Sequence, residues 1–320
     1  MKTAVSSKAV SIGKKGIRRR SRESLTEKIQ VMGMMLPSVV FLALFSIYPI
    51  LWVLKFMFYD YDDANPAKFI GLDNFVRVFT RDTHFWFSVW NTLVYAGGKI
   101  ILTIPLSFVL ALLLNEGLKG KDFIRATIFM PTIISTSVVS MMFYYILNPY
   151  NGVLNLLMQR FGIIEDPINW LGSEHAMLAA IIVAVWGAIG NYMIYFLAGL
   201  QSIPKEVYES ASIDGANKLQ TMWYITIPML GPVMQIIIML AIIISLKGYE
   251  SIMVLTGGGP AGSTEVMFLY VYKLFFPMSD GSDFRVDYGY GATASFVSAL
   301  IVGLITCAYL WYSKKLNQDT

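Results

Sequence analysis

Polar side chains interrupt three long apolar stretches of the chain, and their types suit contact with a hydroxyl-rich solute. Hydroxyl and amide groups can hydrogen-bond such a solute, while an aromatic ring covers its C–H face. The residues that we predict to line a path for it are Tyr144, Asn191, Tyr192, Ser245, Lys247, Gly248, Tyr249 and Glu250. The same groups could instead join neighbouring helices or place tyrosines at the headgroup level. Lys247 and Glu250, three residues apart, could pair beside the path or extend outward to water.

Residues for catalysis are scarce. Neither the His-Glu-x-x-His nor the Gly-x-Ser-x-Gly signature occurs, and one cysteine with two histidines cannot close a zinc shell. The run from Gly257 to Thr264 nearly spells a phosphate-binding loop, but Ser263 stands where that loop needs its lysine. We therefore interpret this run as a structural turn and expect the chain not to be an enzyme.

Composition indicates a membrane protein. Apolar residues make up 56% of the 320 positions and charged residues 14%, against about 25% charged residues in soluble domains. The mean hydropathy is +0.57. A bilayer core needs about 20 apolar helical residues, and six stretches qualify, which predicts an all-α integral membrane protein with six transmembrane helices. These spans cover residues 31–54, 88–114, 126–147, 176–200, 229–251 and 292–312. A shorter apolar run, 266–276, is interpreted as an interfacial or re-entrant helix.

Charge sets the orientation. With the N-terminus inside, the inner segments hold sixteen Lys and Arg residues and the outer segments eight, which predicts that both termini are cytoplasmic. The basic tail, residues 1–30, is interpreted as an orientation signal that contacts anionic lipid rather than nucleic acid. The first span is too long for a signal peptide and is expected to be retained. Lys99 lies mid-span, so it should face the interior or a partner subunit; its role stays open.

The inner loop 201–228 between spans four and five carries a predicted surface helix. Ser202 is expected to cap it and Gly215 to end it in the left-handed conformation. Val207, Ala211 and Gly215 recur every four residues and so share one thin face. A second short helix should run from Asn217 to Ile227. From periodicity alone, such a helix could rest on lipid or dock a partner.

This loop resembles the EAA motif of binding-protein-dependent ABC importer permeases, through Glu209, Ala211, Gly215, Ile225 and Pro228 at the motif's spacing. Ser210 and Ile227 depart mildly from it. The chain also resembles the maltose-type sugar permeases, in the residues around Asp214 and Gln220 and in Leu255–Pro260 after span five. The resemblance implies the MetI/maltose-permease-like fold and a coupling helix seated on an ATPase. The residues that it places in that joint are Glu209, Ala211, Asp214 and Gly215.

The resemblance further implies that this chain is the permease subunit of an ATP-driven importer of a sugar or oligosaccharide in the bacterial cytoplasmic membrane. Its partners would be a homologous second permease, two ATPase subunits that bind ATP and Mg, and an extracytoplasmic sugar-binding protein. The chain itself would hold no cofactor. The alternatives are a secondary transporter driven by an ion gradient, and the same permease role with a glycerol-phosphate-type cargo. The sequence does not name the sugar or say which permease makes most contacts with it.

Overall fold

The computed structural model describes residues 25–62, 65–116, 119–276 and 286–316. Within these ranges the chain is almost wholly helical, and it divides into two compact units, residues 1–53 and 54–320. Residues 1–24, which hold most of the predicted basic tail, lie outside the described ranges.

The first unit contains the first long apolar helix. Its segments are α1 (Leu25–Leu42), the π-helical η1 (Ala43–Ile47) and α2 (Tyr48–Phe56), the last of which runs across the boundary between the units. Residues 29–56 form one candidate membrane span with a mean hydropathy of 2.1. Because 28 residues of helix extend about 42 Å, this segment is long enough to cross a bilayer.

The second unit begins with a two-stranded antiparallel sheet, in which β1 (Tyr59–Asp60) pairs with β2 (Lys68–Phe69). The helices up to the middle of the unit are α3 (Asp73–Val76), η2 (Arg77–Arg81), α4 (Thr83–Asn115), α5 (Lys121–Ile133), α6 (Thr136–Ile146), α7 (Val153–Arg160) and α8 (Ala176–Ser202). Those that follow are α9 (Lys205–Ile213), α10 (Lys218–Thr221), η3 (Met222–Thr226), α11 (Ile227–Met229), α12 (Gly231–Lys247), α13 (Glu250–Leu255), α14 (Met267–Phe275) and α15 (Tyr288–Leu316).

The predicted spans correspond to four long apolar helices and two bent helix pairs in the described part of the chain. The helices are residues 29–56, α4, α8 and residues 288–315 of α15. The third predicted span is α5 and α6, which meet at 95°, and the fifth includes α12, which is bent by 69° from residues 218–229. The all-α membrane fold is therefore confirmed, but two of its spans are broken rather than straight. The short helix expected near residues 266–276 is α14.

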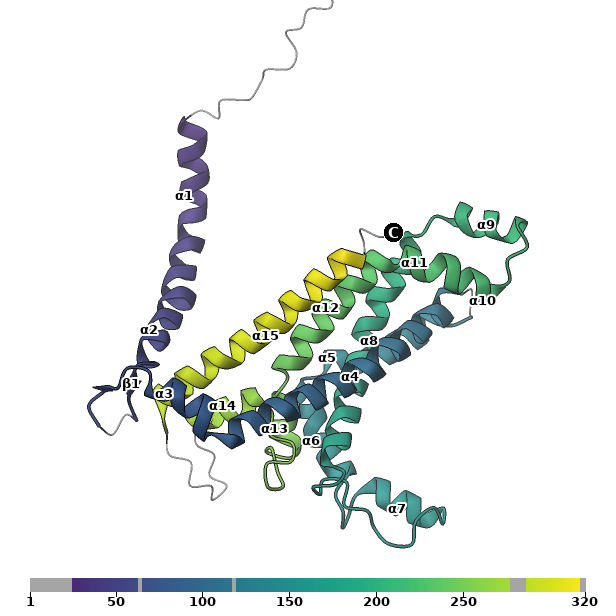
Figure 1. Ribbon diagram of the computed structural model, residues 1–320. Coiled ribbons are helices and arrows are strands. Elements are labelled where there is room, and N and C mark those ends of the chain that lie inside the picture. The colour runs from purple at the N-terminus through teal and green to yellow at the C-terminus, as the bar shows by residue number, and fades with distance from the viewer. Residues whose placement is uncertain (1–24, 63–64, 117–118, 277–285, 317–320) are drawn as a thin grey trace, which may run out of the picture. The chain divides into compact units, whose positions relative to one another are not determined.

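Helix α4 packs most extensively on α8, and α12 packs on both. Figure 1 shows these helices running along one another, with α9, α10 and α11 at one end of the unit and α7 at the other. Glycine makes one contact possible: a Cβ on Gly190 of α8 would lie 2.5 Å from the carbonyl oxygen of Ile128 in α5. The helix that precedes the first break therefore lies directly against α8.

The start of α4 is tied to two later helices by Asp82. Its carboxylate accepts hydrogen bonds from the hydroxyls of Tyr270 in α14 and Tyr290 in α15, and from the backbone N–H of Phe85. Burial alone raises the pKa of Asp82, but these hydrogen bonds and the nearby Arg77 outweigh it, so the pKa lies below its ordinary value. Asp82 is thus held as a carboxylate at the junction of three helices.

The glycine-rich run after α13 forms a closed turn. The hydroxyls of Thr256 and Thr264 lie 2.7 Å apart, and Thr264 also donates to the carbonyl oxygen of Gly259. Its backbone N–H donates to the carbonyl oxygen of Gly258. These bonds fold the run onto itself, as expected for a structural turn.

Candidate functional site

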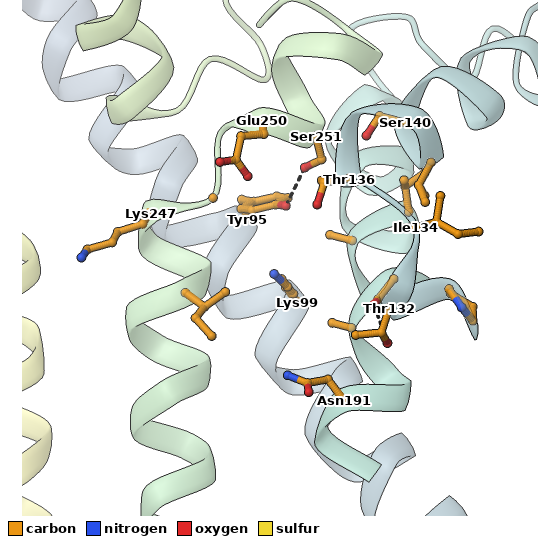
Figure 2. Close-up of a pocket in the computed structure, with 18 of the residues that line it drawn as sticks. Tyr95, Lys99, Thr132, Ile134, Thr136, Ser140, Asn191, Lys247, Glu250 and Ser251 are labelled. Carbon is orange, nitrogen blue, oxygen red and sulfur yellow. Dashed lines mark hydrogen bonds between the residues drawn. The ribbon is translucent and has the colours of Figure 1, made fainter. Parts of the chain in front are cut away.

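Two helix breaks border one cavity, the one between α5 and α6 and a further one between α12 and α13. It has a volume of about 520 Å³ and is lined by α4, the α5–α6 pair, α8 and the α12–α13 segment. Figure 2 shows these elements surrounding it, with polar side chains entering from several of them. Broken helices suit such a place, because backbone outside a helix is tolerated at membrane depth only where it is buried in protein or lines a water-filled cavity.

The first break lies between α5 and α6. Ile134 takes an extended backbone conformation with ψ of 139°, and Ser135 follows with ψ of 135°. Pro131 stays inside α5, three residues before the break. The chain therefore turns by 95° at the wall of the cavity, where Ile134 and Thr136 both line it.

The further break separates α12 from α13 at Gly248 and Tyr249, and it is distinct from the 69° bend that precedes α12. Gly248 leaves the helix with ψ of 105°, and its N–H still donates to the carbonyl oxygen of Ser245 over 3.3 Å. The next helix starts at Glu250, which lines the cavity together with Gly248 and Ser251. The break thus directs polar residues of consecutive turns toward one space.

Hydroxyl, amide and charged groups surround this space. The Tyr95 hydroxyl lies 3.0 Å from the Ser251 hydroxyl, a contact drawn in Figure 2. Asn191 and Lys99 line the cavity as well, and Lys99 is only 8% exposed. Such a set can donate and accept several hydrogen bonds and offers the ring of Tyr95 beside them. The arrangement can hold a hydrated polar molecule without a metal or a nucleophile.

Five of the eight predicted path residues line this cavity: Asn191, Tyr192, Lys247, Gly248 and Glu250. Lys247 and Glu250, both described, form no ion pair within 4.0 Å. In Figure 2 the Lys247 amine points away from the other labelled side chains. Lys247 therefore contributes its stem to the edge of the cavity, whereas Glu250 reaches its upper part.

The other three predicted path residues lie elsewhere. Ser245 is fully buried in α12 and is absent from the cavity wall. Tyr249 turns to α14, where its ring lies 5.7 Å from that of Tyr272. Tyr144 lines a second cavity, of about 550 Å³, beside the turn at Gly257.

Sequence reasoning missed Tyr95, Thr132 and Ser251 in the wall. Tyr95 precedes Lys99 by four residues, so the two share one face of α4, and the mid-span charge could have led to it. Ser251 lies beyond the break in α13, and a continuous helix would have placed it on another face. The expectation that Lys99 faces the interior is confirmed.

Helix α9 stands at the end of the unit where α10 and α11 also lie (Figure 1). Its C-terminus forms a Schellman motif: the N–H of Ala216 donates to the carbonyl oxygen of Ala211, and that of Gly215 to Ser212. Gly215 has φ of +78°, so its predicted left-handed conformation is confirmed. The Ser202 cap is wrong, because Pro204 occupies the cap position and the Ser202 hydroxyl bonds back to Gly199 in α8.

The residues predicted for the joint differ in exposure. Glu209, Asp214 and Gly215 are exposed, whereas Ala211 is buried within this chain with 6% of its surface accessible. The Tyr208 hydroxyl, 3.4 Å from that of Thr226, connects α9 to η3. Asn217 and Gln220 form a capping box at α10, and the helix predicted to stop at Pro228 continues to Met229. Ala211 therefore supports α9 from inside, and the other three residues face outward.

Comparison with known proteins decides the family. The model of the binding-protein-dependent transport system inner membrane component matches residues 103–318, about two thirds of the chain. The chain belongs to this family. The match takes in the C-terminal part of α4, both broken helices, α8 and α9. It therefore includes most of the cavity wall, whereas Tyr95 and Lys99 lie before it.

Relatives and a solved structure agree with this assignment. The permease is 34% identical over 283 residues to the trehalose/maltose transport system permease protein MalF of Thermococcus litoralis, covering 87% of this chain and 91% of that one. It is 32% identical over 292 residues to the lactose transport system permease protein LacF of Rhizobium radiobacter, covering 89% and 95%. A crystal structure of a bacterial ABC transporter that imports the acidic polysaccharide alginate matches with a TM-score of 0.79 at 25% identity, over 92% of this chain and 98% of that chain.

Proposed function

We propose that this chain is the membrane-spanning permease subunit of an ATP-driven importer for a sugar or oligosaccharide. The observation that carries the proposal is the 520 Å³ cavity between two broken helices, lined by hydroxyl, amide and charged groups. A sugar needs many hydrogen bonds and a ring face, and Asn191, Ser251 and Tyr95 offer these groups. The names of the relatives, which concern trehalose, maltose and lactose, support a sugar as cargo.

In this proposal the cargo crosses by alternating access. An extracytoplasmic binding protein delivers the sugar to a second, homologous permease and this chain, and two ATPase subunits bind ATP and Mg on the cytoplasmic side. Both termini of this chain face the cytoplasm, in a bacterial cytoplasmic membrane. ATP binding and hydrolysis drive the change of access only through contacts that differ between the two states.

Helix α9 is the proposed point of contact with the ATPase. Its exposed residues Glu209, Asp214 and Gly215 provide a carboxylate acceptor and a surface without bulk at the helix end. Ala211 is buried within this chain, and the Tyr208 hydroxyl connects α9 to Thr226 of η3. Movement of a docked ATPase would reach α12 through α10, η3 and α11, which follow α9 directly in the chain.

Transport into liposomes tests the proposal. The chain is co-expressed with the proposed second permease and ATPase subunits, the complex is reconstituted, and uptake of radiolabelled sugars is measured with ATP inside or outside the vesicles. We expect uptake only when the ATPases, ATP and the binding protein are all present. Uptake by this chain alone under a proton or sodium gradient would contradict the proposal and support a secondary transporter.

A further inference from the structure

Lys99 is a cation enclosed in the cavity wall. It lies in the middle of the 33-residue helix α4 with 8% of its surface exposed. Among the described residues no hydrogen bond or ion pair to its amine is found; Glu250, which attracts it electrostatically, is not within the 4.0 Å of an ion pair. In Figure 2 the amine lies between Tyr95 above and Asn191 below, with Glu250 further up. A buried charge without a close counter-charge is costly, so this position favours an anionic occupant.

Other unpaired groups line the same cavity. The hydroxyls of Ser140 and Tyr192 are buried and have no hydrogen-bond partner among the residues that the structure describes. Each can donate one hydrogen bond, and the Lys99 ammonium can donate three. An acceptor that enters this part of the cavity can therefore take hydrogen bonds from the ammonium and from both hydroxyls. Carboxylate, sulfonate and phosphate groups are acceptors only, and they form shorter and stronger hydrogen bonds with ammonium donors than neutral groups do.

The position of Glu250 orients such an occupant. Glu250 reaches the upper part of the cavity and is exposed, while Lys99 is enclosed below it. An anionic group is repelled from the carboxylate and attracted to the ammonium, so it would lie at Lys99 with neutral hydroxyls nearer Glu250. A cationic cargo would have to leave Lys99 without a counter-charge, which disfavours it.

We propose that Lys99 binds an anionic group of the cargo, so that the sugar carried by this permease bears a carboxylate, sulfonate or phosphate. This inference rests on the proposed function, because it names the class of sugar that enters the same cavity.

The experiment measures uptake of three matched pairs by the reconstituted complex with ATP. The pairs are maltose and maltobionate, methyl glucoside and methyl sulfoquinovoside, and glycerol and glycerol 3-phosphate, so each anion is compared with its neutral partner. We expect at least one anionic member to be taken up at least tenfold faster than its neutral partner. Which pair shows this separates carboxylate, sulfonate and phosphate.

Variants then assign the preference to Lys99. Lys99→Gln should raise the transport KM of the preferred anion at least tenfold and reduce the preference over its neutral partner, and Lys99→Arg should restore most of it. Lys314→Gln is the matched control, because Lys314 is exposed in the last turn of α15 and lies outside the cavity wall; it should change the KM less than twofold. Wild-type uptake of neutral sugars alone, or an equal loss of both members in Lys99→Gln, overturns this inference and leaves the proposed function standing. No ATP-driven uptake of any of the six probes overturns both.

Discussion

Asp82 accepts hydrogen bonds from two tyrosines that lie 188 and 208 residues further along the chain. Tyr290 in turn supports the guanidinium of Arg77 on its ring, 3.8 Å from the ring centre, and Arg77 pairs with Asp287 over 2.7 Å. This cluster joins η2 and the N-termini of α4 and α15 to α14. Single residues here connect elements that hydropathy alone treats as separate spans.

Asp82→Asn should destabilise the permease, since hydrogen bonds to a charged group contribute about 2 kcal/mol. We expect a fall in Tm of about 4 °C at pH 7, measured by intrinsic fluorescence in detergent. The pKa of Asp82 is lower in the folded chain than in the unfolded one. Its contribution is therefore present above the unfolded pKa of about 3.9 and disappears as the pH falls through the folded value.

The wild type and Asp82→Asn should accordingly converge in Tm below about pH 4, and remain separated at pH 7. Tyr270→Phe, which removes one donor and keeps the ring, should show a smaller difference with the same pH dependence. A constant gap between the wild type and Asp82→Asn from pH 7 to pH 3 would show that ionisation of Asp82 does not stabilise the fold.

The sequence could point to individual residues but not to their neighbours. Lys99 was evident as a mid-span charge, and Gly215 as a helix end, because both depend on a few adjacent positions. The partners of Asp82 and the wall around Lys99 come from distant helices, and no local pattern specifies them. Ser245 was predicted to line the path but does not line the cavity. Its position depends on how α12 is rotated against its neighbours, which no local pattern specifies.

At the level of elements, the close passage of α5 against α8 depends on a missing side chain. Gly190→Ala would place a methyl group 2.5 Å from the Ile128 carbonyl oxygen and 2.8 Å from the Phe129 Cα, both backbone atoms that cannot move freely. We expect a loss of about 1–3 kcal/mol in stability from overpacking, measured as a lower Tm. Gly303→Ala in α15, where a Cβ would contact nothing within 4 Å, is the control and should not lower the Tm.

A second prediction concerns Gly215, at the end of α9. Gly215→Asn keeps the left-handed conformation accessible but adds a side chain to the exposed face, where a Cβ would lie more than 4 Å from the other described residues. If an ATPase docks there, ATP-driven uptake should fall at least tenfold while the chain still inserts into the membrane.

Backbone strain alone is controlled by a glycine far from α9. Gly162 follows α7, near the opposite end of the unit, and it also has a positive φ, of +67° (Figure 1). The control variant is therefore Gly162→Asn. ATP-driven uptake by the Gly162→Asn complex should match that of the wild type. Unchanged uptake in Gly215→Asn would remove α9 from the proposed contact.

Helix breaks were the part of the fold that the sequence did not reveal. Pro131 lies inside α5, yet the chain turns three residues later, at Ile134. The break between α12 and α13 falls at Gly248, in a run that remains apolar enough to be predicted as one span. Hydropathy indicates whether residues tolerate lipid. It does not indicate where neighbouring helices stabilise backbone groups that lie outside a helix.

For the whole molecule, the cavity and α9 belong to the same folded unit. The second half of α4 passes from Lys99 at the cavity to Glu116, which pairs with Lys218 of α10 over 3.1 Å. A second connection is the chain itself, which runs from α9 through α10, η3 and α11 to α12. In the proposed function, a force that an ATPase exerts on α9 would reach the cavity through these helices.

The most direct test of this account fills the cavity. Gly187 lines it, and a Cβ there would contact nothing within 4 Å, so the indole of Gly187→Trp should occupy the space that the cargo needs. Gly303→Trp adds the same side chain at an exposed position of α15 outside the cavity. In reconstituted vesicles, Gly187→Trp should lower ATP-driven sugar uptake at least tenfold, and Gly303→Trp should not change it. Wild-type uptake by an assembled Gly187→Trp complex would contradict the assignment of this cavity as the path.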